Sequence, residues 1–462
     1  MKFRGFHLFA VILRGATRNR TGDTRIFSPL LYQLSYGTII NMLRVLKRVQ
    51  IYDVFFYHAN IFQKKLISLY HYFNPNARNM LTLITNGQVL TSQGWRKNFD
   101  ILFDQDRIIL ISEHIDRSDC DQIIDAEGKY IIPGGIDLHV HGGGGHDFLE
   151  GTEEAFSKAI EAHQRHGTTA IYPTLAAASI DTILQAAKIT EKLMNDPHSP
   201  IMGLHLECPY LNPEMAGAQN KEHITNPRKE EYMEILSQTN CIKRWDAAPE
   251  LEGALEFGRY ISSRGIIAAV AHTKARYETI KAASEAGYNF ATHFYNAMTS
   301  VHKCREYKHE GTIESIYLMD DMNVEVIADG IHVPPAILRM IYKFKGVERT
   351  CLVTDAMGCT ASNSTTLYDP RVIIEDGVCK LSDRSALAGS IATMDRLIQT
   401  MVLEAEIPLK DAVCMSSETP AKIMGIYHRK GSLEEGKDPD IVMLNHDLQV
   451  EDVWCMGRRV RR

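Results

Sequence analysis

The chain has 462 residues, 45% of them hydrophobic and 23% charged, with nine cysteines and a formal net charge of −6. This composition excludes collagen-like, disulfide-scaffold and wholly disordered proteins, and the acidic balance gives no indication of nucleic-acid binding. The charge is unevenly distributed. Residues 1–79 hold 12 Lys/Arg and 2 Asp/Glu, whereas the remainder holds 39 and 55, a net of −16. Two segments of different composition therefore meet near residue 80.

The first 79 residues form a basic, aromatic segment of a kind that can serve as a targeting sequence, a membrane anchor or a nucleic-acid tail. The apolar run Phe6–Leu13 is cut short by Arg14, and no stretch reaches the ~18 apolar residues of a membrane span. Residues 15–37 are similar to the conceptual translation of a transfer-RNA gene, and Met80 directly precedes a strand-like segment. We expect residues 1–79 to be a non-native or disordered extension, with no membrane or nucleic-acid partner.

The rest of the chain predicts one fold class. Residues 80–132 are expected to form short strands, and between residues 133 and 428 eight apolar runs alternate with helix-period segments, as in a (β/α)8 barrel. Two strand-like runs follow in residues 429–462. We therefore predict an α/β fold, a (β/α)8 TIM-like barrel with a small β-sandwich domain built from 80–132 and 429–462. The apolar runs are Ile136–His141, Ala170–Leu175, Ile201–Glu207, Ile242–Ala248, Ile266–His272, Phe290–Phe294, Val324–Asp329 and Cys351–Asp355.

The helices are predicted from the same alternation of patterns. Between the first six runs they are expected at Thr152–His166, Ile180–Met194, Leu251–Arg264 and Tyr277–Ala286, and after the eighth run at Thr393–Glu406, Leu409–Met415 and Pro420–Met424. The mixed charge run Lys221–Glu231 is interpreted as a solvated face.

The ends of the apolar runs carry side chains that bind metals. Barrel enzymes place their chemistry at the carboxyl ends of the strands. His139 and His141 lie two residues apart, so both imidazoles face the same side of a strand. Later runs end in His205 and Glu207, His272, His293 and Asp355. Nitrogen and oxygen ligands suit Zn²⁺, Fe²⁺ or Mn²⁺, and the nine cysteines show no CxxC spacing. The sequence predicts a divalent-metal site in a protein with reduced thiols.

Several motifs resemble those of the amidohydrolase superfamily, and within it the deacetylases of N-acetylglucosamine 6-phosphate. The resemblance runs from about residue 81 to 460. It is strong because the motifs occur in the family's order. They are Pro133–His141, His205–Asn212, Ala248–Glu250, Ala271–Thr273, Thr292–Met298, Ile327–His332, Val353–Ala356 and Leu387–Ser390.

This resemblance implies a cytoplasmic hydrolase that cleaves the acetamide of an amino-sugar phosphate. Glu207, His272 and His293 would hold the main metal, and His139 and His141 a second one with Glu207 as the bridge. The general acid and base would be Asp355.

The resemblance also implies substrate contacts. Asn296, Ala297 and His332 would bind the sugar phosphate, and Arg305 would reach the phosphate from the neighbouring subunit of a homodimer. Gln219 stands where some members use a histidine to polarise the acetyl carbonyl. An amide can donate a hydrogen bond there, but it cannot become a cation.

Three alternatives stay open. The substrate can be the galactosamine epimer, the enzyme can be another amidohydrolase such as a D-aminoacylase, or the barrel can be an inactive scaffold. Near the predicted site, Gly142–Gly145 is expected to form a flexible turn without the Gly-Lys-Ser/Thr ending of a phosphate loop, and Asp329 is expected to cap or orient a neighbour.

Overall fold

Eight parallel strands form the central barrel of the computed structural model, which describes residues 80–364 and 367–460. The prediction for residues 1–79 lies outside the described residues. The hydrogen-bonded order is β17-β16-β13-β12-β11-β10-β9-β6, and it confirms all eight predicted runs. The strands are β6 (Gly135–Val140), β9 (Thr168–Leu175), β10 (Leu204–Leu206), β11 (Ile242–Ala247), β12 (Ile267–Val270), β13 (Tyr288–Ala291), β16 (Asn323–Ile327) and β17 (Thr350–Val353).

Hydrogen bonds beyond the strand ladders close the barrel between its first and last strands. The amide of Asp355 donates to the carbonyl of His139 at 2.9 Å, and the amide of His141 donates to the carbonyl of Ala356 at the same distance. These bonds lie at the carboxyl ends of β6 and β17, where the predicted polar residues stand. The closure therefore brings the first and last predicted site segments side by side.

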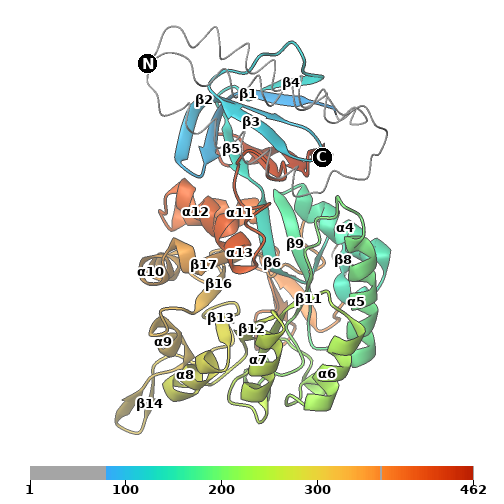
Figure 1. Ribbon diagram of the computed structural model, residues 1–462. Coiled ribbons are helices and arrows are strands. Elements are labelled where there is room, and N and C mark those ends of the chain that lie inside the picture. The colour runs from blue at the N-terminus through green and yellow to red at the C-terminus, as the bar shows by residue number, and fades with distance from the viewer. Residues whose placement is uncertain (1–79, 365–366, 461–462) are drawn as a thin grey trace, which may run out of the picture. The chain divides into compact units, whose positions relative to one another are not determined.

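The predicted helices surround the barrel (Figure 1), and side-chain caps define where some of them start. The Ser179 side chain accepts a hydrogen bond from the amide of Thr182 at the start of α5, and Thr152 does the same for Ala155 in α4. The predicted helix Thr393–Glu406 is an α-helix continued by a π-helical turn, η5. The confirmed helices are α4 (Glu153–Gln164), α5 (Ile180–Met194), α7 (Ala254–Ser263), α8 (Tyr277–Glu285), α11 (Met394–Gln399) with η5 (Thr400–Glu404), α12 (Leu409–Ser416) and α13 (Glu418–Ile423).

Other elements were not predicted. Helix α6 (Lys229–Gln238) begins inside the charge run Lys221–Glu231, in which Pro227 and Glu231 are buried, residues 223–225 are partly buried and the rest are exposed. Its apolar side buries Tyr232, Ile235 and Leu236. The structure also contains α9 (Thr312–Tyr317), α10 (Pro335–Lys345) and three two-stranded hairpins: β7 (Gly142–Gly143) with β8 (His146–Asp147), β14 (His302–Cys304) with β15 (Tyr307–His309), and β18 (Val372–Glu375) with β19 (Val378–Leu381).

Strands from both ends of the described chain join in one small sheet, as predicted (Figure 1). The order is β22-β21-β20-β5-β1-β2-β3, and β4 also pairs with β1. Phe103 on β2 and Trp454 on β21 are separated by three strands in this order, yet their ring centroids lie 6.0 Å apart. The sheet therefore curls around a shared apolar core. Its strands are β1 (Thr82–Thr91), β2 (Gly94–Phe103), β3 (Ile108–Ser112), β4 (Gln122–Asp125), β5 (Tyr130–Pro133), β20 (Ile441–Leu444), β21 (Val450–Cys455) and β22 (Arg458–Arg459).

None of the described helices is both long enough and apolar enough to cross a lipid bilayer.

Candidate active site

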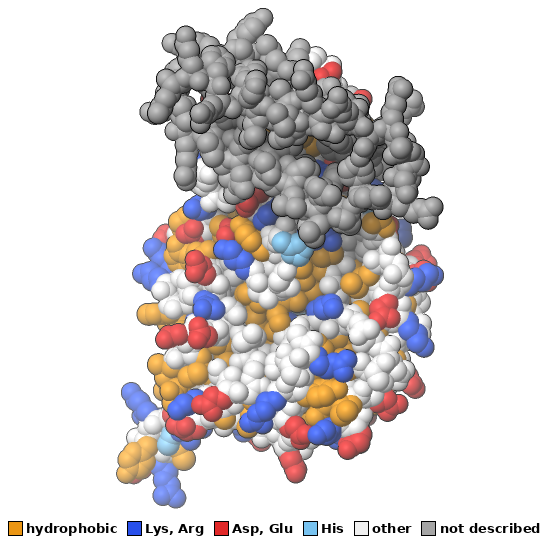
Figure 2. Space-filling view, viewed as in Figure 1, with side chains coloured by type: hydrophobic (Ala, Val, Ile, Leu, Met, Phe, Trp, Pro, Cys, Tyr) orange, Lys and Arg blue, Asp and Glu red, His pale blue; other side chains and the backbone are white. Residues whose placement is uncertain are grey.

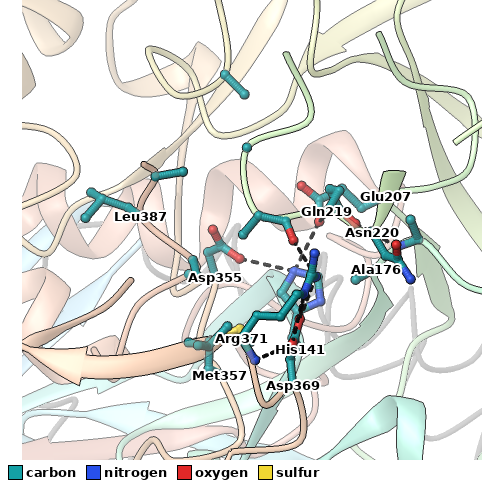
Figure 3. Close-up of a pocket in the computed structure, with 18 of the residues that line it drawn as sticks. His141, Ala176, Glu207, Gln219, Asn220, Asp355, Met357, Asp369, Arg371 and Leu387 are labelled. Carbon is teal, nitrogen blue, oxygen red and sulfur yellow. Dashed lines mark hydrogen bonds and ion pairs between the residues drawn. The ribbon is translucent and has the colours of Figure 1, made fainter. Parts of the chain in front are cut away.

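A cavity of about 1110 Å³ opens at the carboxyl ends of the barrel strands (Figure 3). It collects most of the side chains that the sequence singles out. His139 is fully buried and does not line the cavity, and Arg305 does not line it either. The predicted residues that line the cavity are His141, Glu207, Gln219, His272, His293, Asn296, Ala297, His332 and Asp355.

The buried carboxylate of Glu207 stands between two sets of imidazoles. Its Oε1 lies 3.0 Å from His272 Nε2 and 2.9 Å from His293 Nε2. Its Oε2 lies 3.1 Å from His141 Nε2 and 3.4 Å from His139 Nε2. The six potential ligands thus fall into two compact groups that share this carboxylate as a neighbour, namely Glu207, His272 and His293, and His139, His141 and Asp355.

Backbone turns at the strand ends direct three of these side chains into the cavity. His272, His293 and Asp355 have φ angles of 43°, 28° and 48°, in the left-handed region that residues other than glycine rarely adopt. Such a conformation costs about 1–3 kcal/mol per residue and persists only where the surrounding structure enforces it. Three of the residues predicted to carry the chemistry therefore have strained backbone.

In three histidines the Nδ1 atom lies within hydrogen-bonding distance of an acceptor. His139 Nδ1 lies 2.6 Å from Glu325 Oε1, His272 Nδ1 lies 2.7 Å from the carbonyl of Met215, and His293 Nδ1 lies 3.1 Å from that of Asn296. These oxygens only accept, so each Nδ1 carries a proton, and in the form that binds a metal each ring turns its Nε2 lone pair inward. These lone pairs face carboxylate oxygens. Two acceptors cannot hydrogen-bond to each other, whereas a divalent cation between them binds both. The donor set therefore fits a metal.

The electrostatics of the cluster agree with this fit. Burial opposes the charged form of His139, but Glu325, Glu207 and Asp355 outweigh it and raise the pKa of His139 well above its usual value. For His141, burial is likewise outweighed by Asp355 and Glu207, which raise its pKa to about 10. Burial also opposes the charged form of Glu207, yet His139 and other imidazoles hold its pKa well below the usual range. The carboxylates thus strongly favour positive charge in this space.

Gln219 reaches the centre of the site. The amide of Ala177 donates to Gln219 Oε1 at 2.7 Å, which turns the side-chain NH₂ group toward Glu207 Oε2 at 2.8 Å (Figure 3). Hydrogen-bond donors from this side chain are therefore directed at the reacting region of the cavity.

Two further predicted residues stand ready for a ligand. Asn296 Nδ2 is buried and has no hydrogen-bond acceptor among the described residues. His332 Nδ1 lies 2.7 Å from Asp329 Oδ2, and Asp329 also accepts from the amides of Ile331 and His332. Asp329 therefore caps this turn and orients His332, as expected from the sequence.

Arg305 lies at the turn of the β14–β15 hairpin, whose residues do not line the cavity. Figure 2 shows this hairpin as a projection that carries basic and apolar side chains away from the body of the barrel. Tyr307 beside the turn is 65% exposed. In this chain, then, Arg305 and the other predicted substrate contacts do not come together.

Other polar residues of the site were missed. The guanidinium of Arg244, buried inside the barrel, contacts Glu325, Asp246 and Thr292. The carboxylate of Glu325 in turn holds His139. Charged residues inside a parallel barrel are unusual, and Arg244, Asp246 and Glu325 fall within two of the predicted runs. A charged residue within an otherwise apolar strand was therefore the signal in the sequence that could have identified these residues.

Comparison with known proteins finds the Amidohydrolase family and deacetylases of amino-sugar phosphates. The sequence profile of the Amidohydrolase family matches residues 130–460. The N-acetylglucosamine-6-phosphate deacetylase of Vibrio furnissii is 32% identical over 378 residues, which cover 81% of this chain and 93% of that relative. The N-acetylgalactosamine-6-phosphate deacetylase of Escherichia coli O157:H7 is 29% identical and is covered over 97% of its length by 80% of this chain.

Solved structures agree with the sequence comparison. A variant N-acetyl-D-glucosamine-6-phosphate deacetylase from Mycobacterium smegmatis, in complex with N-acetyl-D-glucosamine-6-phosphate, superimposes with a TM-score of 0.76 at 28% identity. The match covers 83% of this chain and all of the other. The N-acetylglucosamine-6-phosphate deacetylase of Pasteurella multocida gives a TM-score of 0.77 at 27% identity, with coverage of 82% and 99%.

Proposed function

Because the chain belongs to the amidohydrolase family, we propose that it hydrolyses the acetamide of N-acetyl-D-glucosamine 6-phosphate to D-glucosamine 6-phosphate and acetate, a step of amino-sugar catabolism. The single observation that carries the proposal is the carboxylate of Glu207 between two sets of inward-facing imidazoles, at the base of a cavity large enough for a sugar phosphate. Deacetylase relatives that match nearly their whole length support the substrate class.

The metal would be held by this chain's own nitrogen and oxygen donors. Glu207, His272 and His293 are the proposed ligands of a first divalent ion, and His139 and His141 those of a second, with Zn²⁺, Fe²⁺ or Mn²⁺ as the candidates. A divalent ion bound there lowers the pKa of a water molecule toward ~7 and stabilises negative charge on a carbonyl oxygen. The protein supplies the remaining steps of amide hydrolysis.

Asp355 is the proposed general base and acid. Its Oδ1 lies 3.2 Å from His141 Nε2 at the cavity wall. Burial raises the pKa of its carboxyl, but His139 and His141 outweigh burial and lower it, so the group is a carboxylate that can take a proton. It would accept the proton of the attacking water and return it to the departing amine nitrogen.

The remaining groups are proposed to bind and orient the sugar. Gln219 would donate a hydrogen bond to the acetyl oxygen, where negative charge develops. Asn296, Ala297 and His332 would contact the sugar phosphate, and Arg305 would enter the site of a second copy in a homodimer. The β14–β15 hairpin projects from the body of the barrel and does not line its own cavity, which supports a role in a neighbouring subunit.

Two further parts of the proposal concern organisation and location. We divide the enzyme into a first β segment at 80–132, a barrel at 133–428 and a second β segment at 429–462, because β5 and β20 pair across these boundaries. We also propose a cytoplasmic location, since all nine cysteines are free thiols.

The decisive test measures acetate release from N-acetylglucosamine 6-phosphate, before and after treatment with a chelator and after metal is returned. We expect chelation to abolish release and metal to restore it. N-Acetylgalactosamine 6-phosphate is the second candidate, because a curated relative carries that name. Faster turnover of this epimer would reassign the substrate, and equal turnover of unphosphorylated N-acetyl amino acids would favour an aminoacylase. No release from any of these compounds by metal-loaded protein would contradict the proposal.

A further inference from the structure

The long excursion between β17 and α11 contributes an ion pair to the wall of the cavity. Asp369 and Arg371 precede strand β18, and both line the cavity (Figure 3). Arg371 is the only lysine or arginine among the described residues that line it. The proposed mechanism gives neither residue a role.

The geometry of Arg371 is set by Asp369. Arg371 Nε lies 3.1 Å from each carboxylate oxygen of Asp369, and Nη2 lies 2.6 Å from Oδ2. The backbone amide of Arg371 also donates to Asp369 Oδ1 at 2.8 Å. This two-pronged pairing fixes the plane of the guanidinium more firmly than a single contact would.

The same guanidinium reaches a second segment of the chain. Arg371 Nη2 donates to the carbonyl oxygen of Ala218 at 2.9 Å, across 153 residues of sequence. Ala218 precedes Gln219 directly, in a turn that begins with Gly217 at a φ of 56°. Gln219 then donates to Glu207 Oε2 at 2.8 Å. Two hydrogen bonds, joined through the covalent chain at Ala218–Gln219, therefore connect the β17–α11 excursion to the carboxylate at the centre of the site.

We infer that Asp369 and Arg371 are positioning residues that hold the Ala218–Gln219 turn, so that the Gln219 amide is presented to the acyl oxygen of the substrate. The inference rests on the proposed function for the identity of that oxygen. Ala177 fixes the Gln219 side chain from one side, and Arg371 fixes its backbone from the other. An amide cannot offset poor placement with a positive charge, so its contribution depends on this geometry.

The kinetic test compares Arg371→Met with Arg384→Met. Arg384 lies on the same excursion and pairs with Glu375 at 3.0 Å, but it does not line the cavity, so it is a matched control. Losing one donor to the developing oxyanion costs about 10²–10³ in kcat, and we expect misplacement of Gln219 to cost about 10-fold. KM should stay within about twofold, and Arg384→Met should behave as the wild type.

A double-mutant cycle separates positioning from direct substrate contact. If Arg371 acts through Gln219, Arg371→Met should have no further effect on kcat in a Gln219→Ala background. The Arg371→Met loss in kcat should also be equal for phosphorylated and unphosphorylated substrate. A rise in KM confined to the phosphorylated substrate would overturn the inference, because it would make Arg371 a phosphate ligand. Additive losses in the cycle would overturn it as well.

A measurement that does not require catalysis tests the inference independently of the proposed reaction. Amide hydrogen exchange of residues 216–220 should be faster in Arg371→Met than in the wild type and in Arg384→Met. Arg371→Lys should be intermediate, because an ammonium can reach Ala218 but cannot pair with both oxygens of Asp369. Unchanged exchange in Arg371→Met would show that the turn does not depend on Arg371. Failure of wild-type protein to release acetate would instead contradict only the proposed function.

Discussion

The carboxylate of Glu325 lies on the side of the His139 ring that faces away from Glu207, with 2.6 Å between Glu325 Oε1 and His139 Nδ1. The same oxygen accepts the backbone amide of His293 at 3.0 Å. One buried carboxylate thus touches a residue from each of the two ligand groups. Glu325 is itself held by Arg244 inside the barrel.

Replacing Glu325 with glutamine should weaken metal binding while keeping the fold. The amide has the same shape, but it no longer fixes the proton on His139 Nδ1, so the inward lone pair is lost part of the time. Changes of this kind typically cost 10–100-fold in metal affinity. Competition with a metal-binding dye measures it, and Glu310→Gln is the control because Glu310 pairs only with surface groups such as Arg276. Equal affinity in both variants would refute the role.

Asp355→Asn should retain the ion held by Glu207, His272 and His293 and lose turnover. The first ligand group does not contain Asp355, and an amide cannot take the proton of water. Loss of a general base typically costs 10²–10⁴-fold in rate. Metal content by mass spectrometry and acetate release by coupled assay would be measured on the same sample. The exposed Asp376→Asn provides the control, and full activity of Asp355→Asn would remove the residue from the mechanism.

Trp454→Ala should destabilise the whole described unit. The Trp454 side chain is 1% exposed and packs against Phe103 from the opposite half of the curled sheet. Truncating a buried aromatic of this size costs about 3–5 kcal/mol. Urea unfolding followed by circular dichroism measures the loss. The half-buried Trp95 should cost less on truncation, and an equal loss for both would contradict the role assigned to the core of the small sheet.

His163 should make stability sensitive to mild acid. Burial lowers the pKa of this imidazole to about 4, and its Nε2 lies 2.8 Å from the carbonyl of Gly142. The folded pKa is below the unfolded value, so the neutral form favours folding, and its contribution is lost as pH falls from about 6.5 toward 4. The loss attributable to this residue is about 2 kcal/mol at pH 5.

The comparison for His163 uses unfolding free energies at pH 7.5 and pH 5. His163→Gln keeps a donor for Gly142 and should lose less stability on acidification than the wild type. The exposed His428→Gln should follow the wild type. Identical pH dependence in all three proteins would rule out His163 as the cause.

The sequence predicts the barrel well because each strand is a short apolar run whose polar residues gather at one end. His139, His141 and Glu207 can be identified from the sequence because they stand at the ends of such runs. Glu325 and Arg244 are different, because their role depends on which strands face each other across the barrel interior. They lie 81 residues apart, and no local pattern joins them.

Elements whose form depends on tertiary contacts were also harder to predict. Helix α6 starts in a charged run and is defined by the burial of a few apolar side chains. The contact between Arg371 and Ala218 spans 153 residues and involves a backbone carbonyl, which leaves no trace in the choice of amino acid at position 218. Backbone acceptors of this kind appear only once the chain has folded.

The pairing of β5 with β20 has a consequence for synthesis on the ribosome. Strand β5 pairs with β1 along one edge and with β20 along the other. The edge that pairs with β20 stays open until residues 441–444 have been made. All eight barrel strands precede these residues in the chain. A nascent chain that already contains the barrel strands therefore still carries an unpaired strand edge, and such an edge invites pairing with other chains. The synthesis of β20 is what closes this edge.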